Sequence, residues 1–264
     1  MEKNIRVFRG WSLFCIFASL AVFVWLIAAS RASGEVNASI DLKGAYEDNI
    51  TGSAADVGKG GDFYSVLNAS LGGYYGIGAN TYLFLKGDAG GYLYSKYTDL
   101  NAIVVGINGG VYKDFTARVA AQLMLKGKRK EFKDSRRDSV AYGGSIEVKE
   151  QISPRFWLKQ AYEFEENDAD NALFTYRGHS LGAWAGYMVF PKTTLTGGYS
   201  FLSLEYDEPS NFRNEFHTVS VGISREVIKK VSLYGNYYRQ FINSSASEKG
   251  RANNIFFIGL LYSY

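Results

Sequence analysis

The chain has 264 residues, of which 16% are aromatic, 29 are glycine and only 3 are proline. This composition suits one medium-sized domain of long strands, because proline interrupts strands and aromatic side chains are frequent at membrane interfaces. The formal net charge of +3 comes from 29 basic and 26 acidic residues. Lys3, Arg6, Arg9 and Arg31 against Glu2 account for all of it, since without residues 1–32 the balance is 29 − 4 = 25 basic and 26 − 1 = 25 acidic. The charge therefore gives no support for nucleic-acid binding.

The first 32 residues have the layout of a secretory signal peptide. A basic start precedes an apolar run over 11–29, and small residues follow. Ser30 and Ala32 suit the −3 and −1 positions of a cleavage site, so we predict cleavage after Ala32, with Ser30 and Gly34 as the alternative positions. The predicted organisation is a signal peptide over 1–32 and one further domain over 33–264. Because an apolar run of 19 residues is nearly long enough to cross a bilayer, an uncleaved anchor is the alternative.

The only cysteine, Cys15, lies inside this apolar run. Its removal with the signal peptide leaves a chain that has no disulfide framework and no cysteine metal site. We therefore expect no metal and no cofactor.

The remainder of the chain alternates apolar with small or polar residues, which is the period of a β-strand. Ile103, Val105 and Ile107, for example, share one face, and Val104 and Gly106 share the other. This pattern predicts an all-β fold, a transmembrane antiparallel up-and-down β-barrel of about twelve strands. The strands are predicted at 36–46, 62–75, 81–93, 101–112, 115–127, 139–152, 156–166, 174–190, 193–206, 215–227, 231–242 and 254–264.

Short and long connections alternate between these strands. Short turns are predicted near 76–78, 113–114, 153–155, 191–192 and 229–230, and longer polar stretches at 47–61, 94–100, 128–138, 165–172, 207–214 and 243–253. Short turns on one side and longer loops on the other are typical of outer-membrane barrels. A soluble β-sandwich is the alternative, although its strands are usually shorter.

The last predicted strand is apolar or aromatic at every second position, and its aromatic residue ends the chain. It resembles the C-terminal targeting strand of bacterial outer-membrane proteins. The resemblance implies an integral protein of the bacterial outer membrane, in contact with membrane lipid and lipopolysaccharide, that the barrel-assembly machinery inserts. The residues that carry it are Phe256, Ile258, Leu260, Tyr262 and Tyr264.

If the apolar set faces lipid, the opposite set lines the lumen. The candidate lumen-lining residues are Lys86, Asp88, Arg118, Lys126, Glu147, Lys149, Lys159 and Glu163, with Asp41, Lys43 and Glu165 in the same phase. Both signs of charge occur in similar numbers, which fits either a salt-bridged interior or a pore with charged walls. Inward aromatic residues, among them Trp157 and Trp184, either fill the lumen or stack on sugars.

Two predicted loops carry opposite charge: residues 126–137 are basic and residues 163–170 are acidic. Adjacent loops of this kind can pair with each other or contact lipopolysaccharide phosphates, and an anion-attracting mouth is the functional alternative.

Hydrolases among twelve-stranded outer-membrane barrels need a histidine with a serine or a carboxylate nearby, and the chain has only His179 and His217. Both are in phase with lipid-facing residues, whereas Ser180 and Ser220 point the other way, so we do not expect an enzyme. The leading hypothesis is a porin-like passive channel for small polar solutes. The alternative is a non-transporting barrel that acts as a partner in envelope assembly or export, and an outer-membrane lipid hydrolase is disfavoured.

Overall fold

The computed structural model describes residues 35–50, 60–208, 212–245 and 247–264. The predicted signal peptide, residues 1–32, lies outside these described residues. The strands are β1 (Glu35–Glu47), β2 (Asp62–Gly78), β3 (Thr81–Tyr94), β4 (Ala102–Asp114), β5 (Val119–Phe132), β6 (Ser139–Ser153), β7 (Phe156–Ala169), β8 (Tyr176–Phe190), β9 (Thr193–Tyr206), β10 (Phe212–Ile228), β11 (Val231–Ser244) and β12 (Ser247–Ser263).

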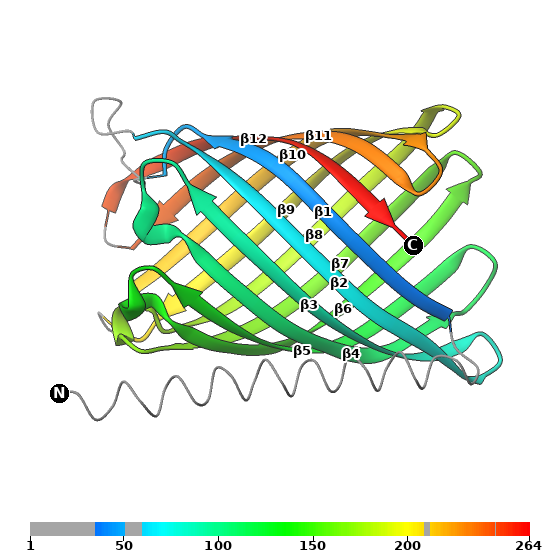
Figure 1. Cartoon of the computed structure of the whole chain (residues 1–264), viewed down its shortest axis with the longest axis horizontal. Helices are drawn as coiled ribbons and strands as arrows, with labels where there is room; N and C mark the ends of the chain where they lie inside the picture. Colours follow the sequence, from blue (N-terminus) through cyan, green and yellow to red (C-terminus); the bar gives the residue numbers. More distant parts are fainter. Residues whose placement is uncertain (1–34, 51–59, 209–211, 246) are drawn as a thin grey trace.

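The twelve strands form a closed antiparallel barrel in which each strand pairs with its neighbours in sequence (Figure 1). β1 closes the barrel against β12, with Ser39 opposite Ser263 and Glu47 opposite Ile255. Closure leaves no free strand edge, so the backbone donors and acceptors of every strand are paired within the sheet. The predicted all-β fold, an antiparallel up-and-down barrel of twelve strands, is confirmed.

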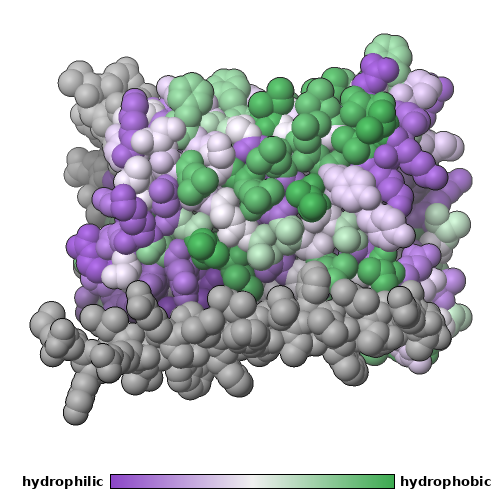
Figure 2. Space-filling model, viewed as in Figure 1, coloured by the Kyte–Doolittle hydropathy of each residue, from purple (hydrophilic) through white to green (hydrophobic). Residues whose placement is uncertain are grey.

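The outer face of the barrel is apolar. Side chains such as Leu125 (71% exposed) and Ile258 (64% exposed) project outward from the middle of their strands. Figure 2 shows hydrophobic side chains over the middle of the wall and hydrophilic ones toward both ends. All five residues of the predicted C-terminal signal lie exposed on this outer face of β12 or at its end: Phe256, Ile258, Leu260, Tyr262 and Tyr264.

The connections at one end of the barrel are tight turns, and β1 starts and β12 finishes toward this end (Figure 1). Three of these turns place a non-glycine residue at positive φ: Asn80 (55°), Lys192 (64°) and Lys230 (71°). This conformation strains most L-residues. The turns predicted at 76–78 and 113–114 are wrong by a few residues, because β2 continues through Gly78 and β4 through Asp114.

At the opposite end the strands reach further than predicted. Residues 128–132 belong to β5, residues 165–169 to β7 and residues 247–253 to β12, although their polar composition predicted loops. Three 3₁₀ turns complete the described connections there: η2 (Thr98–Leu100), η3 (Ser135–Arg137) and η4 (Ala172–Phe174). In the part of the chain that the structure describes, no helix has the length and apolar character needed to cross a membrane.

Candidate functional site: the inner wall of the barrel

The inner wall is formed by the residues that alternate with the apolar outer set. Seven of the eight predicted lumen-lining residues lie on inward positions of strands: Lys86, Asp88, Lys126, Glu147, Lys149, Lys159 and Glu163. Arg118 does not, because β5 begins only at Val119 and Arg118 is exposed in the β4–β5 turn. The Thr116 hydroxyl accepts hydrogen bonds from the N–H groups of Arg118 and Val119, at 3.1 and 3.0 Å, and so fixes this turn. The strand prediction over 115–127 missed the turn because Phe115, Ala117 and Val119 continue the apolar alternation.

A lysine–glutamate cluster lies on the inner wall between β5 and β7. The Lys126 ammonium contacts the carboxylates of both Glu163 and Glu165, and its side chain is only 6% exposed. Glu165 also lies 2.8 Å from the Lys128 ammonium and 3.1 Å from that of Lys130. The Glu165 carboxylate therefore contacts three ammonium groups, and Glu163 contributes a second carboxylate to the cluster.

Beside this cluster, the intervening strand β6 carries small inward residues, among them Ala141, Gly143 and Ser145. Lys126 pairs in register with Gly143 of β6, and Gly143 pairs with Glu165 of β7. A Cβ at Gly143 would lie 2.0 Å from the main-chain oxygen of Phe164 in the neighbouring strand. No residue larger than glycine therefore fits at this position. The lysine side chains cross this gap to reach the glutamates two strands away.

Sequence reasoning missed Lys128 and Lys130, because the run Lys128-Arg129-Lys130 looked like a loop. The pattern that places them is that Lys128 and Lys130 continue, at every second residue, the inward positions that include Lys126. The oppositely charged segments predicted as loops at 126–137 and 163–170 thus lie largely in β5 and β7, where Lys128 and Lys130 pair with Glu165 along the same stretch of wall.

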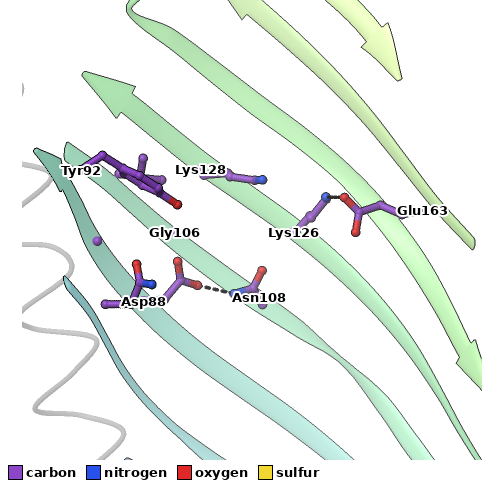
Figure 3. Close-up of a pocket in the computed structure, with 10 residues that line it drawn as sticks. Asp88, Tyr92, Gly106, Asn108, Lys126, Lys128 and Glu163 are labelled. Carbon is purple, nitrogen blue, oxygen red and sulfur yellow. Dashed lines mark hydrogen bonds and ion pairs between the residues drawn. The ribbon is translucent and has the colours of Figure 1, made fainter. Parts of the chain in front are cut away.

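A cavity of about 300 Å³ lies beside this cluster on the inner wall (Figure 3). Asp88 of β3 accepts a hydrogen bond of 2.5 Å from the Asn108 amide of β4 on one side, and Lys126, Lys128 and Glu163 lie on the other. The wall is hollow here because β4 contributes Gly106, which pairs directly with Asp88. Charged groups of both signs and an amide therefore face one another across the cavity.

Lys86 lies exposed on the inner face of β3, between Gly72 of β2 and Asn108 of β4. Within the described residues, no hydrogen bond or ion pair joins its ammonium to another side chain. It is therefore a free positive charge on the wall.

Charge is distributed unevenly around the wall. The inward positions of β8, β9 and β11, as the structure describes them, hold only uncharged side chains, including Ser180, Thr196, Ser200 and Gln240. In the described strands, the ion pairs between two inward side chains lie on the arc from β1 to β7, where Lys159 of β7 also lies 3.2 Å from Glu147 of β6. The lumen thus has a charged wall and a neutral, hydroxyl-bearing wall.

Both histidines lie on the outer face. His179 Nδ1 is 2.8 Å from the Tyr162 hydroxyl, and His217 Nδ1 is 2.7 Å from the Tyr199 hydroxyl. Ser180 and Ser220 alternate with these positions and face the lumen, so neither histidine shares a face with its neighbouring serine. Among the described residues, no group of three or more histidine, cysteine, aspartate or glutamate side chains is arranged to hold a metal ion.

No protein-family model matches the sequence, and no curated protein matches it. Solved structures do share the architecture. An outer membrane channel from Pseudomonas putida F1 superposes with a TM-score of 0.62 at 12% identity, over 88% of this chain and 96% of that chain. A KdgM porin solved with disordered oligogalacturonate has a TM-score of 0.53 at 13% identity, over 86% of this chain and 99% of that one. The NanC porin gives 0.53 at 11% identity, over 84% and 98%. At these identities the likeness establishes the fold: the chain is a twelve-strand β-barrel that resembles outer-membrane porins and channels.

Proposed function

We propose that this protein is an integral outer-membrane barrel, exported by a cleaved signal peptide, whose lumen lets small polar solutes diffuse passively. The observation that carries the proposal is the contrast between the two faces of one closed sheet. The outer face is apolar, and the inner face carries ion pairs, amides and hydroxyls that are stable only beside water or one another.

The charges of the inner wall favour weak discrimination between cations and anions. Lys126, Lys128 and Lys130 lie against Glu163 and Glu165, and Lys159 lies against Glu147, so charges of opposite sign compensate one another at short range. A neutralised wall presents no continuous field of one sign to a passing ion. Small uncharged or zwitterionic solutes are therefore the preferred cargo.

The purified protein in planar lipid bilayers tests this proposal. We expect discrete conductance steps and, across a tenfold KCl gradient, a reversal potential close to zero. Preparations that insert and fold but never conduct would remove the channel function. A large reversal potential would leave a channel and contradict the weak selectivity.

The second candidate is a barrel that does not transport and serves as a partner in envelope assembly or export. Two inward aromatic clusters favour it, because they narrow the lumen. One contains Tyr64 and Tyr94, with ring centroids 4.7 Å apart, and the other contains Tyr74 and Phe84 at 5.7 Å. Swelling of proteoliposomes in small sugars, compared with protein-free liposomes, separates the two candidates.

The outer face supports a passive role in the membrane. The C-terminal strand presents its alternating apolar residues where the barrel-assembly machinery would pair with it, and the exposed apolar band would contact lipid and lipopolysaccharide. We assign no hydrolytic activity, since both histidines are bound to tyrosines on the outer face.

A further inference from the structure

Two tryptophans lie on the inner wall in the half of the barrel that contains the tight turns. Trp184 of β8 pairs with Gly198 of β9, and its indole also reaches Gly182 of its own strand. A Cβ at Gly198 would lie 2.1 Å from Cδ1 of the ring, and a Cβ at Gly182 would lie 2.1 Å from Cη2. Because opposite ends of the indole touch the two glycines, the ring lies along the wall.

Trp157 of β7 has the same arrangement. It pairs with Gly186 of β8, where a Cβ would lie 2.2 Å from Cε2 of the indole. Glycine is the residue that lets a flat ring pack directly on the backbone of a strand. Both tryptophans are half-buried, so one face of each indole is covered by the wall.

The remaining surface of each indole is not covered by another aromatic ring. The ring–ring contacts of the described residues join tyrosines, phenylalanines and histidines elsewhere, and neither tryptophan takes part in one. An ammonium group lies over each ring instead. Lys149 Nζ is 5.5 Å from the Trp157 ring centroid, and Lys159 Nζ is 5.0 Å from that of Trp184.

Hydrogen-bonding groups surround the two rings. Lys159 lies 3.2 Å from the carboxylate of Glu147, and both side chains remain about a third exposed, at 32% and 39%. Thr196 and Ser200 occupy the inward positions on either side of Gly198 in β9. Two apolar faces therefore lie beside donors and acceptors that are open to the lumen.

We propose that Trp157 and Trp184 form a stacking subsite for the pyranose rings of an uncharged oligosaccharide, an inference that rests on the channel function proposed above. The apolar C–H face of a pyranose packs on an aromatic face, and its rim of hydroxyls needs hydrogen-bond partners in the same plane. Lys159, Glu147, Thr196 and Ser200 supply these partners. We assign an uncharged substrate because Glu147 compensates the charge of Lys159 at 3.2 Å and because the adjoining inner face of β8 and β9 carries no charge.

Tryptophan emission tests the proposal directly. The sequence contains four tryptophans, and Trp11 and Trp25 belong to the predicted signal peptide. The protein isolated from membranes is titrated with neutral glucose oligosaccharides of two to six units, and the variant lacking both inner-wall indoles, W157F/W184F, gives the background. We expect a saturable change in emission that strengthens with chain length, together with a saturable block of the ion current.

Three variants, each checked for the folded barrel by its heat-dependent migration on gels, separate stacking from general packing. Trp184→Ala is expected to weaken sugar binding about tenfold, the loss of one aromatic contact, and Trp184→Tyr to retain most of it. Tyr82→Ala removes an inward aromatic of β3 outside the subsite and is expected to leave the affinity unchanged.

The absence of a saturable response, an equal loss for Tyr82→Ala, or tighter binding of an acidic oligosaccharide of the same length would overturn the subsite. Conductance without sugar block contradicts the subsite and leaves the channel function standing. Sugar binding without conductance contradicts the channel function and leaves the subsite standing.

Discussion

Replacing Glu165 by glutamine is the sharpest perturbation of the inner wall. The substitution keeps the shape of the side chain and removes the carboxylate that lies within 3.1 Å of Lys126, Lys128 and Lys130. Glu165 is 13% exposed and Lys126 is 6% exposed, so the remaining lysines cannot recover full hydration. Breaking a buried ion pair by removing one partner costs about 3–5 kcal/mol. Because the lumen admits some water, we expect about 3 kcal/mol, more than a hundredfold in the unfolding equilibrium.

Urea unfolding of the barrel in lipid vesicles, followed by tryptophan emission, measures this loss. Glu147→Gln is the matched control, since it also removes an inward carboxylate from a lysine at 3.2 Å, but both partners are about a third exposed. Exposed pairs contribute at most about 1 kcal/mol. Equal effects of the two substitutions, or a change below about 0.5 kcal/mol for Glu165→Gln, would refute the view that the cluster stabilises the wall. Lys130→Met combined with Glu165→Gln is expected to recover part of the loss, because Lys126 keeps its contact with Glu163, whereas Lys130, 16% exposed, is the more buried of the two lysines left without a carboxylate.

The remaining predictions concern the backbone and the selectivity of the lumen. Gly143→Ala is expected to prevent or strongly destabilise folding, because the added carbon meets the Phe164 main-chain oxygen. Gly127→Ala is the control and is expected to fold normally, since no atom lies within 4 Å of its Cβ. The heat-dependent migration of each variant on gels measures whether it folds. Asn80→Val forces a β-branched residue to φ 55° and is expected to cost about 1–2 kcal/mol in the same urea assay, and no loss would contradict the strained turn. Lys86→Glu replaces the unpaired ammonium and should shift the reversal potential toward cation selectivity, while an unchanged potential would place Lys86 outside the ion path.

The sequence predicted a lumen-lining residue correctly where the alternation of inward and outward positions along a strand was sufficient to place it. Lys126 and Glu163 were assigned to the lumen from alternation alone, and the structure joins them. Their partners Lys128 and Lys130 were predicted to lie in a loop, since a run of basic residues gives no local sign that a carboxylate lies two strands away. Arg118 failed for the opposite reason: the alternation of apolar residues continued through a turn that the Thr116 hydroxyl fixes.

The sequence by itself determined the properties that depend on neighbours in the chain. The period of two specified strands and their faces, tight turns such as Pro191-Lys192 delimited the hairpins, and the apolar alternation of β12 marked the outer face. These features are local, because side-chain direction in a strand repeats every two residues.

Only the tertiary structure decided which inward groups meet. The pairing of β5 and β7 with the two edges of β6 brings Glu165 to Lys126, 39 residues apart, across Gly143 of β6. The pairing of β8 with β9 likewise lays Trp184 on Gly198. Such contacts depend on strand register and on the space that a glycine leaves in the neighbouring strand, and neither quantity is encoded in the alternation of any single segment.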